Sequence, residues 1–226
     1  MVFKAFLALA TNFIIFGGLL FLPAGTLDWW RAWVFVGVIV ISAIATVVTV
    51  FRADDALWNE RLKPPIQEGQ PLPDKIITVL FLAAFLALIV SIPLDVFRYH
   101  LLGKPNAIIA GVGLFLFVAG WLMVSLSFKA NTFAAPVVKY QAERQQTVID
   151  TGVYGIVRHP MYAGAVLLMI GMPLWLESYA AVGWAIVPTA LLAVRILIEE
   201  QFLRQALEGY TAYTQRVRYR LLPYVW

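Results

Sequence analysis

Long runs of uncharged, apolar residues constrain this chain more than any other feature of its sequence. Such runs lie near 5–22, 32–51, 76–94 and 107–128, and two more lie near 161–176 and 179–198. A helix needs about 20 mostly apolar residues to cross about 30 Å of hydrocarbon. We therefore predict an all-α integral membrane protein with about six transmembrane helices, the last two of which form a helical hairpin over 160–198.

The composition excludes several other classes of protein. Hydrophobic residues make up 62% of the chain and charged residues only 13%, whereas a soluble domain is about 25% charged. This balance excludes a soluble enzyme, a disordered chain and a nucleic-acid-binding domain. With no cysteine and two histidines, the sequence offers no disulfide framework or thiolate site, and we expect no metal centre.

The positions of the basic residues predict how the chain is oriented. If the N-terminus is cytoplasmic, every Lys and Arg except Arg31, Arg98 and Lys104 falls on the cytoplasmic side, as the positive-inside rule requires. Six spans then place the C-terminus in the cytoplasm as well. The tryptophans within 29–33 are expected in an aromatic belt at the outer interface.

The longer polar segments, 52–75, 129–160 and 199–226, all face the cytoplasm in this arrangement. The cytoplasmic loop 52–75 is predicted to form a short helix over 54–62, followed by an extended, proline-rich linker. We divide the chain into N-terminal transmembrane helices over 1–128, about four spans, and a core over 129–226. That core would comprise the helical hairpin and an amphipathic, basic tail on the inner leaflet.

One cluster of functional interest precedes the fifth span. Pro160 suits a first helical turn, where its missing N–H costs nothing. A helix N-terminus beside Arg158 and His159 is a ready site for a carboxylate or phosphate. The alternative is that Arg158 and His159 only anchor the chain at the membrane interface.

A second cluster, Arg195, Glu199 and Glu200, ends the sixth span. Arg195 and Glu199 are four residues apart, share one helical face and could pair. Ionisable groups at that depth usually face a cavity or the bundle interior. The alternative is that Arg195 extends to the surface and that both glutamates lie where the helix leaves the lipid.

These clusters occur in an ordered set that resembles the isoprenylcysteine carboxyl methyltransferase family. The set reads Gly152-x-Tyr154-x-x-x-Arg158-His159-Pro160-x-Tyr162-x-Gly164, then Arg195-x-x-x-Glu199-Glu200, then Gly209-Tyr210-x-x-Tyr213-x-x-x-Val217. The likeness is strongest over 129–223 and extends weakly to 57–64, which is similar to a loop of prokaryotic members. The family also includes, more distantly, phospholipid methyltransferases.

The resemblance implies a cytoplasmic pocket for S-adenosyl-L-methionine, formed by the C-terminal half of the chain. The segment 146–149 would contact the cofactor through its backbone. Tyr154 would form part of the pocket wall, and Glu199 would hold the cofactor by hydrogen bonds. Arg195 would be the catalytic residue and face the carboxylate of the substrate. The eukaryotic enzymes usually place a histidine where this chain has Gln146. The full cofactor set is Gln146, Thr147, Val148, Ile149, Tyr154, His159, Pro160, Met161, Tyr162 and Glu199.

The predicted function is therefore transfer of a methyl group to a lipophilic acceptor, an isoprenylcysteine-like carboxylate being favoured. Such a carboxylate is already ionised, so alignment of the reactants suffices and no general base is needed. The alternatives are phospholipid N-methyl or small-thiol S-methyl transfer, a sterol-reductase-like NADPH oxidoreductase with a similar tail over 217–223, and a non-enzymatic transporter or scaffold. The expected partners are a lipophilic or lipidated substrate and membrane lipids, without nucleic acid. The short loops and the 57–64 stretch favour a prokaryotic inner membrane.

Overall fold

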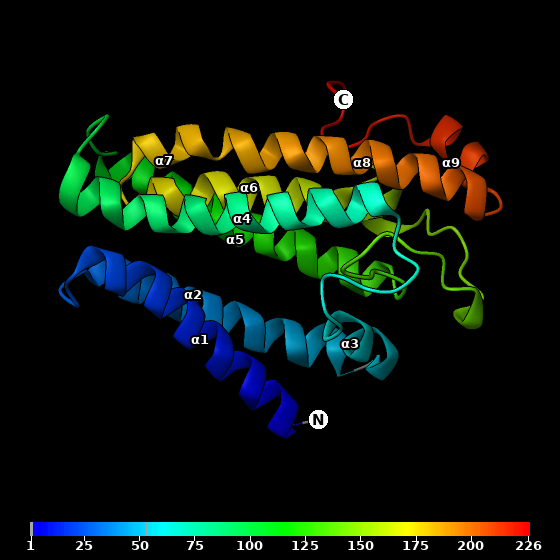
Figure 1. The fold of residues 1–226 in the computed structure, drawn as a ribbon, viewed down its shortest axis with the longest axis horizontal. Helices are drawn as coiled ribbons and strands as arrows, with labels where there is room; N and C mark the ends of the chain where they lie inside the picture. Colours follow the sequence, from blue (N-terminus) through cyan, green and yellow to red (C-terminus); the bar gives the residue numbers. More distant parts are fainter. Residues whose placement is uncertain (1, 53) are drawn as a thin grey trace.

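The structure is a computed structural model that describes residues 2–52 and 54–226, with side chains from residue 10 onward except at 12 and 55. All regular elements in this part of the chain are helical (Figure 1). The α-helices are α1 (Val2–Ala24), α2 (Trp30–Thr46), α3 (Asp55–Arg61), α4 (Leu72–Leu94), α5 (Ala107–Ala130), α6 (Pro160–Trp175), α7 (Tyr179–Trp184), α8 (Ile186–Ala206) and α9 (Tyr210–Arg216). Shorter elements are the π-helical η1 (Val47–Phe51) and η2 (Asp95–Tyr99) and the 3-10 turns η3 (Ala142–Arg144) and η4 (Gly152–Gly155).

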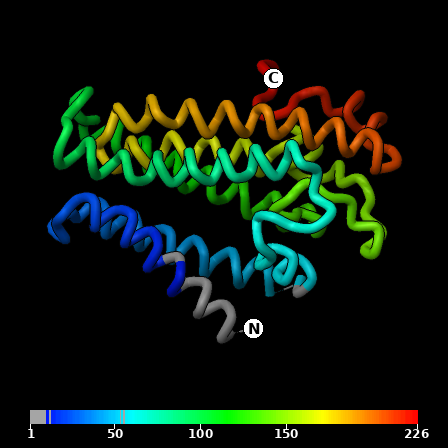
Figure 2. The backbone as a smooth tube through the Cα atoms, viewed as in Figure 1, coloured from blue at the N-terminus to red at the C-terminus, as the bar shows by residue number. Residues whose placement is uncertain are grey.

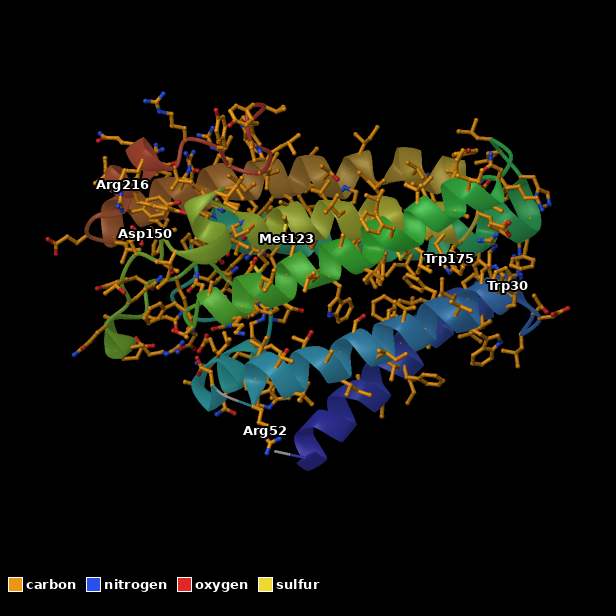
Figure 3. The ribbon with its side chains drawn as sticks, turned by 180° about the vertical axis from the view of Figure 1, so that it is seen from behind. Trp30, Arg52, Met123, Asp150, Trp175 and Arg216 are labelled. Atoms are coloured by element: carbon orange, nitrogen blue, oxygen red, sulfur yellow. The ribbon has the colours of Figure 1, made fainter. Side chains whose placement is uncertain are left out.

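The long helices run roughly along one direction, and their connections differ in length at the two ends (Figures 1 and 2). Short connections at one end join α1 to α2, η2 to α5, and α6 to α7. The other end carries the segments 52–71, 131–159 and 207–226, and we call it the long-loop end. Figure 3 shows Trp30 and Trp175 at the short-loop end and Arg52, Asp150 and Arg216 at the long-loop end. This lopsided arrangement is the one that the polar segments of the sequence predict.

Four helical segments are long and apolar enough to cross a membrane: Trp30–Phe51, Leu72–Tyr99, Ala107–Ala130 and Tyr179–Ala206. Two further apolar segments are shorter, Phe13–Ala24 and Pro160–Trp175. At 1.5 Å per residue, the 16 residues of α6 extend only about 24 Å, less than the roughly 30 Å of a hydrocarbon core. The described chain is thus helical with four segments able to cross a membrane, while the count of six spans stays a prediction.

Helices α5 and α6 approach each other unusually closely because glycines face glycines. A Cβ atom built on Gly120 would lie 2.6 Å from the carbonyl oxygen of Gly164, and one on Gly164 would lie 2.7 Å from that of Gly120. Gly113 and Gly171 make the same kind of contact closer to the short-loop end. Small residues of this kind allow membrane helices to pack backbone against backbone. The contact fixes the start of α6, which is where the predicted site begins.

One aromatic residue of the predicted outer belt lies in the core instead. Trp29 is buried, with 5% of its surface exposed, whereas Trp30 and Trp33 remain exposed. Trp29 precedes the first residue of α2 and packs edge-on against Phe21 and Phe97. The expectation of a belt position was therefore wrong for Trp29, because the turn between α1 and α2 directs its ring inward.

Residues from both predicted parts of the chain share one apolar core. That core includes Leu20, Ile39 and Leu88 from the first part and Met172 and Ile196 from the second. The predicted helix near 54–62 is present as α3, and the carboxylate of Asp54 caps it by accepting a hydrogen bond from the backbone N–H of Leu57 at 2.8 Å. These contacts hold the N-terminal helices against the segment that contains the site.

Candidate functional site

A pocket lies at the long-loop end, between the N-terminus of α6, the C-terminal half of α8, helix α9 and two connecting segments. It gathers residues that lie far apart in the sequence. Its lining consists of Asn131, Phe133, Ala134, Ala135, Val137, Val138, Lys139, Gln146, Thr147, Val148, Ile149, Tyr154, Arg158, His159, Met161, Tyr162, Arg195, Glu199, Leu203, Leu207, Tyr210 and Tyr213. All residues predicted to contact the cofactor or the substrate are among them, with the single exception of Pro160.

Pro160 lies on the opposite face of α6. It lines an apolar groove together with Ala163 and Leu167 of the same helix. Residues 160, 163 and 167 follow the helical repeat, so they share a face that points away from Met161 and Tyr162. Pro160 is thus not among the residues that line this pocket, and its contact with the cofactor stays a prediction, while Pro160 does begin the helix as expected.

Glu199 and Tyr162 form a hydrogen-bonded pair in the wall of the pocket. The hydroxyl of Tyr162 donates to Oε2 of Glu199 at 2.7 Å. The Tyr162 ring also stacks on the His159 ring, with centroids 5.6 Å apart and planes 7° apart. Glu199 stays partly exposed while Tyr162 is buried. The pair presents a carboxylate to the pocket and holds it in one orientation.

Arg195 pairs with an acid that the sequence analysis missed. Its Nε donates to Oδ1 of Asp74 in α4 at 3.0 Å, and its Nη2 donates to the carbonyl oxygen of Pro136 at 2.8 Å. Asp74 is fully buried and also accepts hydrogen bonds from Gln70 Nε2 and the backbone N–H of Val138. The predicted pairing of Arg195 with Glu199 does not form. Asp74 lies 121 residues away in the chain, so helical spacing could not reveal it.

Glu200 has a different set of partners from its neighbour Glu199. Its Oε1 accepts from Arg158 Nε at 2.7 Å and lies 3.3 Å from His159 Nε2, and its Oε2 accepts from Arg204 and Arg220, each at 3.2 Å. Only 2% of Glu200 is exposed. A carboxylate this buried needs opposite charges around it. The start of α6 and the end of α8 are therefore joined through Glu200.

The C-terminal segment is joined to the same place. The backbone N–H groups of Arg158 and His159 donate to the carbonyl oxygens of Tyr219 and Arg220, each at 2.9 Å. Arg158 Nη1 donates to the carbonyls of Val217 and Arg218 at 2.8 Å. The charge of Arg158 is thus used within the protein. This leaves the expected anion site at the start of α6 without the arginine assigned to it.

Tyrosines of α9 and η4 close the pocket. Tyr210 and Tyr213 are buried, and the Tyr213 hydroxyl donates to the carbonyl oxygen of Tyr154 at 2.8 Å. Burial raises the pKa of Tyr154 to about 12, so its phenol is neutral at physiological pH. The sequence analysis placed the tail on the membrane surface, but its two tyrosines belong to the site. Their helical spacing of three residues was the available signal.

The segment 146–149, which is predicted to contact the cofactor through its backbone, borders the pocket. It has no regular secondary structure, and all four residues line the pocket. Within the described chain, the backbone N–H and C=O groups of residues 147–149 make no hydrogen bond to protein. Backbone polar groups in a folded protein normally have partners. A polar ligand that borders this segment would supply them.

Several features of the pocket suit S-adenosylmethionine. The cofactor combines an adenosine, a carboxylate, an ammonium and a sulfonium. Glu199 and the faces of Tyr154, Tyr210 and Tyr213 suit its cationic groups. The free backbone of 147–149 suits its hydrogen-bonding groups. Across the residues described, His, Asp and Glu form no group of three or more that could hold a metal ion.

Comparison with known proteins identifies related sequences. Residues 107–209 match the family model for phospholipid methyltransferases. Protein-S-isoprenylcysteine O-methyltransferase B of Arabidopsis thaliana is 30% identical over 117 residues, which cover 50% of this chain and 59% of that protein. A probable protein-S-isoprenylcysteine O-methyltransferase of Oryza sativa subsp. indica is 30% identical over 125 residues, 54% of this chain and 65% of the relative. The matched region thus spans less than two thirds of these curated relatives.

A solved structure extends the comparison to nearly the whole chain. The eukaryotic intramembrane Ras methyltransferase ICMT, an isoprenylcysteine carboxyl methyltransferase, superposes with a TM-score of 0.55. The superposition covers 93% of this chain and 74% of the other, at 18% sequence identity, and so shows a common fold. The ordered motifs, the curated relatives and the shared fold agree in what this chain is similar to, the isoprenylcysteine carboxyl methyltransferases.

Proposed function

We propose that this protein is an integral membrane methyltransferase that uses S-adenosyl-L-methionine and methylates a carboxylate on a lipophilic acceptor of the isoprenylcysteine type. One observation carries the proposal most directly. Residues predicted from widely separated motifs, 146–149, Tyr154, Tyr162, Arg195 and Glu199, line one pocket. If each motif had only a structural role, its residues would not need to line the same pocket.

The residues that would hold the cofactor follow from this geometry. Glu199, oriented by Tyr162, would bind a cationic group, and the backbone of 147–149 would pair with polar edges. His159 and Met161 would line the start of α6. When bound, S-adenosylmethionine supplies a methyl group on a sulfonium, and the C–S electron pair stays with sulfur as the acceptor oxygen forms the new bond.

The protein's own contribution to the reaction is alignment and charge. The buried phenol of Tyr154, with its raised pKa, offers no base at neutral pH, and an ionised carboxylate requires none. The Nε of Arg195 donates to Asp74, and one N–H of its Nη2 donates to the carbonyl of Pro136. No described residue accepts from its Nη1. We assign these remaining donors to the acceptor carboxylate, because a guanidinium group can grip carboxylate oxygens in its own plane.

Phospholipid amine methylation is the second candidate, and the family model matched by residues 107–209 favours it. The amine of such an acceptor must lose a proton, and its nitrogen gains nothing from a nearby guanidinium group. The arginine in the pocket therefore favours a carboxylate, and the curated relatives are named as O-methyltransferases rather than N-methyltransferases. Cytoplasmic placement of the long-loop end and both termini remains part of this proposal. A prokaryotic membrane remains a prediction, and the matching curated relatives are from plants.

Binding of tritium-labelled S-adenosylmethionine to the purified protein in detergent tests the cofactor assignment. We expect saturable binding that unlabelled S-adenosylhomocysteine displaces. NADPH should not compete, because the proposed function does not use it. No retained label, or displacement by NADPH, would contradict the proposed function.

A further inference from the structure

The surroundings of Arg61, at the end of α3, point to a binding site that the cofactor pocket does not include. Arg61 is half-buried, and its Cζ lies 4.6 Å from the centre of the Phe128 ring. No carboxylate or other acceptor among the described residues forms an ion pair or hydrogen bond with its guanidinium. A partly buried cation without a counter-ion is costly, so an external anion is its natural partner.

The acids nearest to this region already have other partners. Glu60, the neighbour of Arg61 on α3, pairs with Lys63 and Lys139. Asp74 pairs with Arg195, and Glu199 accepts from Tyr162.

A second donor on the same helix also lacks a partner. Trp58 precedes Arg61 by three residues, so both lie on one face of α3. The indole Nε1 of Trp58 is buried and donates to no acceptor in the described part of the chain. Buried donors normally find acceptors, and an exception calls for an explanation. An anionic ligand that contacts Arg61 would provide acceptor oxygens at this place.

Both residues line a mostly apolar groove between α2, α3 and α5, which we call the α3 groove. Its remaining polar groups are satisfied: Thr46 Oγ1 lies 2.8 Å from Ser125 Oγ and accepts from Trp121 Nε1 at 3.0 Å. The groove therefore combines apolar walls with one unneutralised cation. Its lining consists of Ala43, Thr46, Val47, Phe51, Trp58, Arg61, Leu62, Trp121, Val124, Ser125 and Phe128.

The α3 groove adjoins the cofactor pocket. Met161 packs on the cluster that contains Phe51, Trp58 and Phe128, and it also lines the cofactor pocket. Burial, the largest influence, lowers the pKa of Arg61, and Tyr162 and Arg195 also act on it electrostatically. Both of these residues line the cofactor pocket. A ligand in the groove would thus place its charged end beside the methyl donor.

We propose that Arg61 binds the anionic group of the methyl acceptor, while the acceptor's apolar chain lies in the α3 groove. This proposal rests on the proposed function and adds a specificity-determining residue to it. Arg195, already paired with Asp74, and Arg61 then face the same carboxylate from two sides. An acceptor with a neutral or cationic end would leave the positive charge of Arg61 without an opposite charge.

Arg61→Gln tests this assignment in lipid nanodiscs. The probes are an S-prenylated N-acetylcysteine and its neutral carboxamide, whose affinities are compared by competition binding in the presence of S-adenosylhomocysteine. We expect the unaltered protein to prefer the carboxylate and Arg61→Gln to lose about tenfold or more of that preference, the range for a hydrogen bond to a charged group. Arg61→Lys should keep part of it. Arg52→Gln is the matched control, since Arg52 is exposed at the same end and should leave the preference unchanged.

Trp58→Phe keeps an aromatic side chain at this position and removes the indole N–H together with part of the ring, so it provides a second variant should Arg61→Gln fail to fold. It should raise the KM for the carboxylate acceptor several-fold with little change in kcat. An equal preference in Arg61→Gln and Arg52→Gln, or no carboxylate preference in the unaltered protein, would overturn the assignment. Loss of S-adenosylhomocysteine binding by the unaltered protein would instead overturn the proposed function, so the two failures are distinguishable.

Discussion

Glu199 and Glu200 are adjacent in the sequence but face different surroundings, because successive helical residues point in directions about 100° apart. Glu199 meets Tyr162 and the pocket, whereas Glu200 meets Arg158, Arg204 and Arg220. One carboxylate is thus available to a ligand. The other neutralises charge within the protein.

Substitution of each glutamate should therefore have a different effect. We expect Glu199→Ala to weaken S-adenosylhomocysteine binding about ten- to a hundredfold, the range for a charge-assisted hydrogen bond, with little change in melting temperature. Glu200→Ala should lower the melting temperature markedly, because it leaves Arg158 buried without its acid. Calorimetry and thermal unfolding on both variants provide the check. Matching effects on affinity would refute the separation of roles.

Asp74 should matter for stability through Arg195. Asp74→Ala removes the acid of a buried pair and leaves the cation behind, at a cost of about 3–5 kcal/mol. Combining it with Arg195→Met should recover part of the lost melting temperature, since neither charge then remains. If the double variant were less stable than Asp74→Ala, the other contacts of Arg195, such as its hydrogen bond to Pro136, would outweigh the cost of its unpaired charge.

At the scale of whole elements, the α5–α6 contact is set by glycine. Gly171→Ala should destabilise the protein by about 1–3 kcal/mol through overpacking, since its Cβ would lie 2.5 Å from the Gly113 carbonyl oxygen. Gly111 also lies in α5 but has open space around it. Gly111→Ala should be neutral or slightly stabilising by helix propensity. Comparable losses of melting temperature in the two variants would contradict the role of close packing.

Helix α3 should respond to acid through Glu60. Burial alone would raise the pKa of Glu60, but hydrogen bonds and charges from Lys139 and Lys63 lower it below its ordinary 4.5. A lowered folded-state pKa means that the stabilisation is present above pH 4.5 and is lost as the pH falls through the lower value. The melting temperature should therefore drop below pH 4.5 more steeply in the unaltered protein than in Glu60→Gln. If melting temperature fell with pH equally in both proteins, Glu60 would contribute no pH-dependent stabilisation.

The elements were largely predictable, and the reasons are physical. Apolar runs identify α2, α4, α5 and α8, because a helix satisfies its backbone hydrogen bonds within one segment of about 20 residues in a membrane. Two features were not predictable, because both depend on neighbouring helices. They are the side of α6 on which Pro160 lies and the burial of the Trp29 ring. The tail, which was expected at the membrane surface, contributes Tyr210 and Tyr213 to the site.

At the scale of the whole molecule, the site depends on contacts between distant parts of the chain. Local motifs identified the residues around α6 and α8, because the chemistry there is carried by neighbouring residues. They could not identify Asp74, since α4 meets Arg195 of α8 only after the bundle has assembled. Arg61 lies within the weak match over 57–64, but nothing in its local sequence shows that it lies near Tyr162 and Arg195. Contacts between distant helices are thus what the local patterns do not predict.

The nature of the methyl acceptor is the central claim, and one measurement tests it most directly. The purified protein in lipid nanodiscs is incubated with S-adenosylmethionine labelled in the methyl group and an S-prenylated N-acetylcysteine, and the lipophilic product is then treated with alkali. A carboxyl methyl ester releases its label as volatile methanol, whereas N-methyl and S-methyl groups resist alkali. We predict alkali-labile label that depends on Glu199 and Arg195. Label that resists alkali, or no transfer to the prenylated acid, would contradict the account.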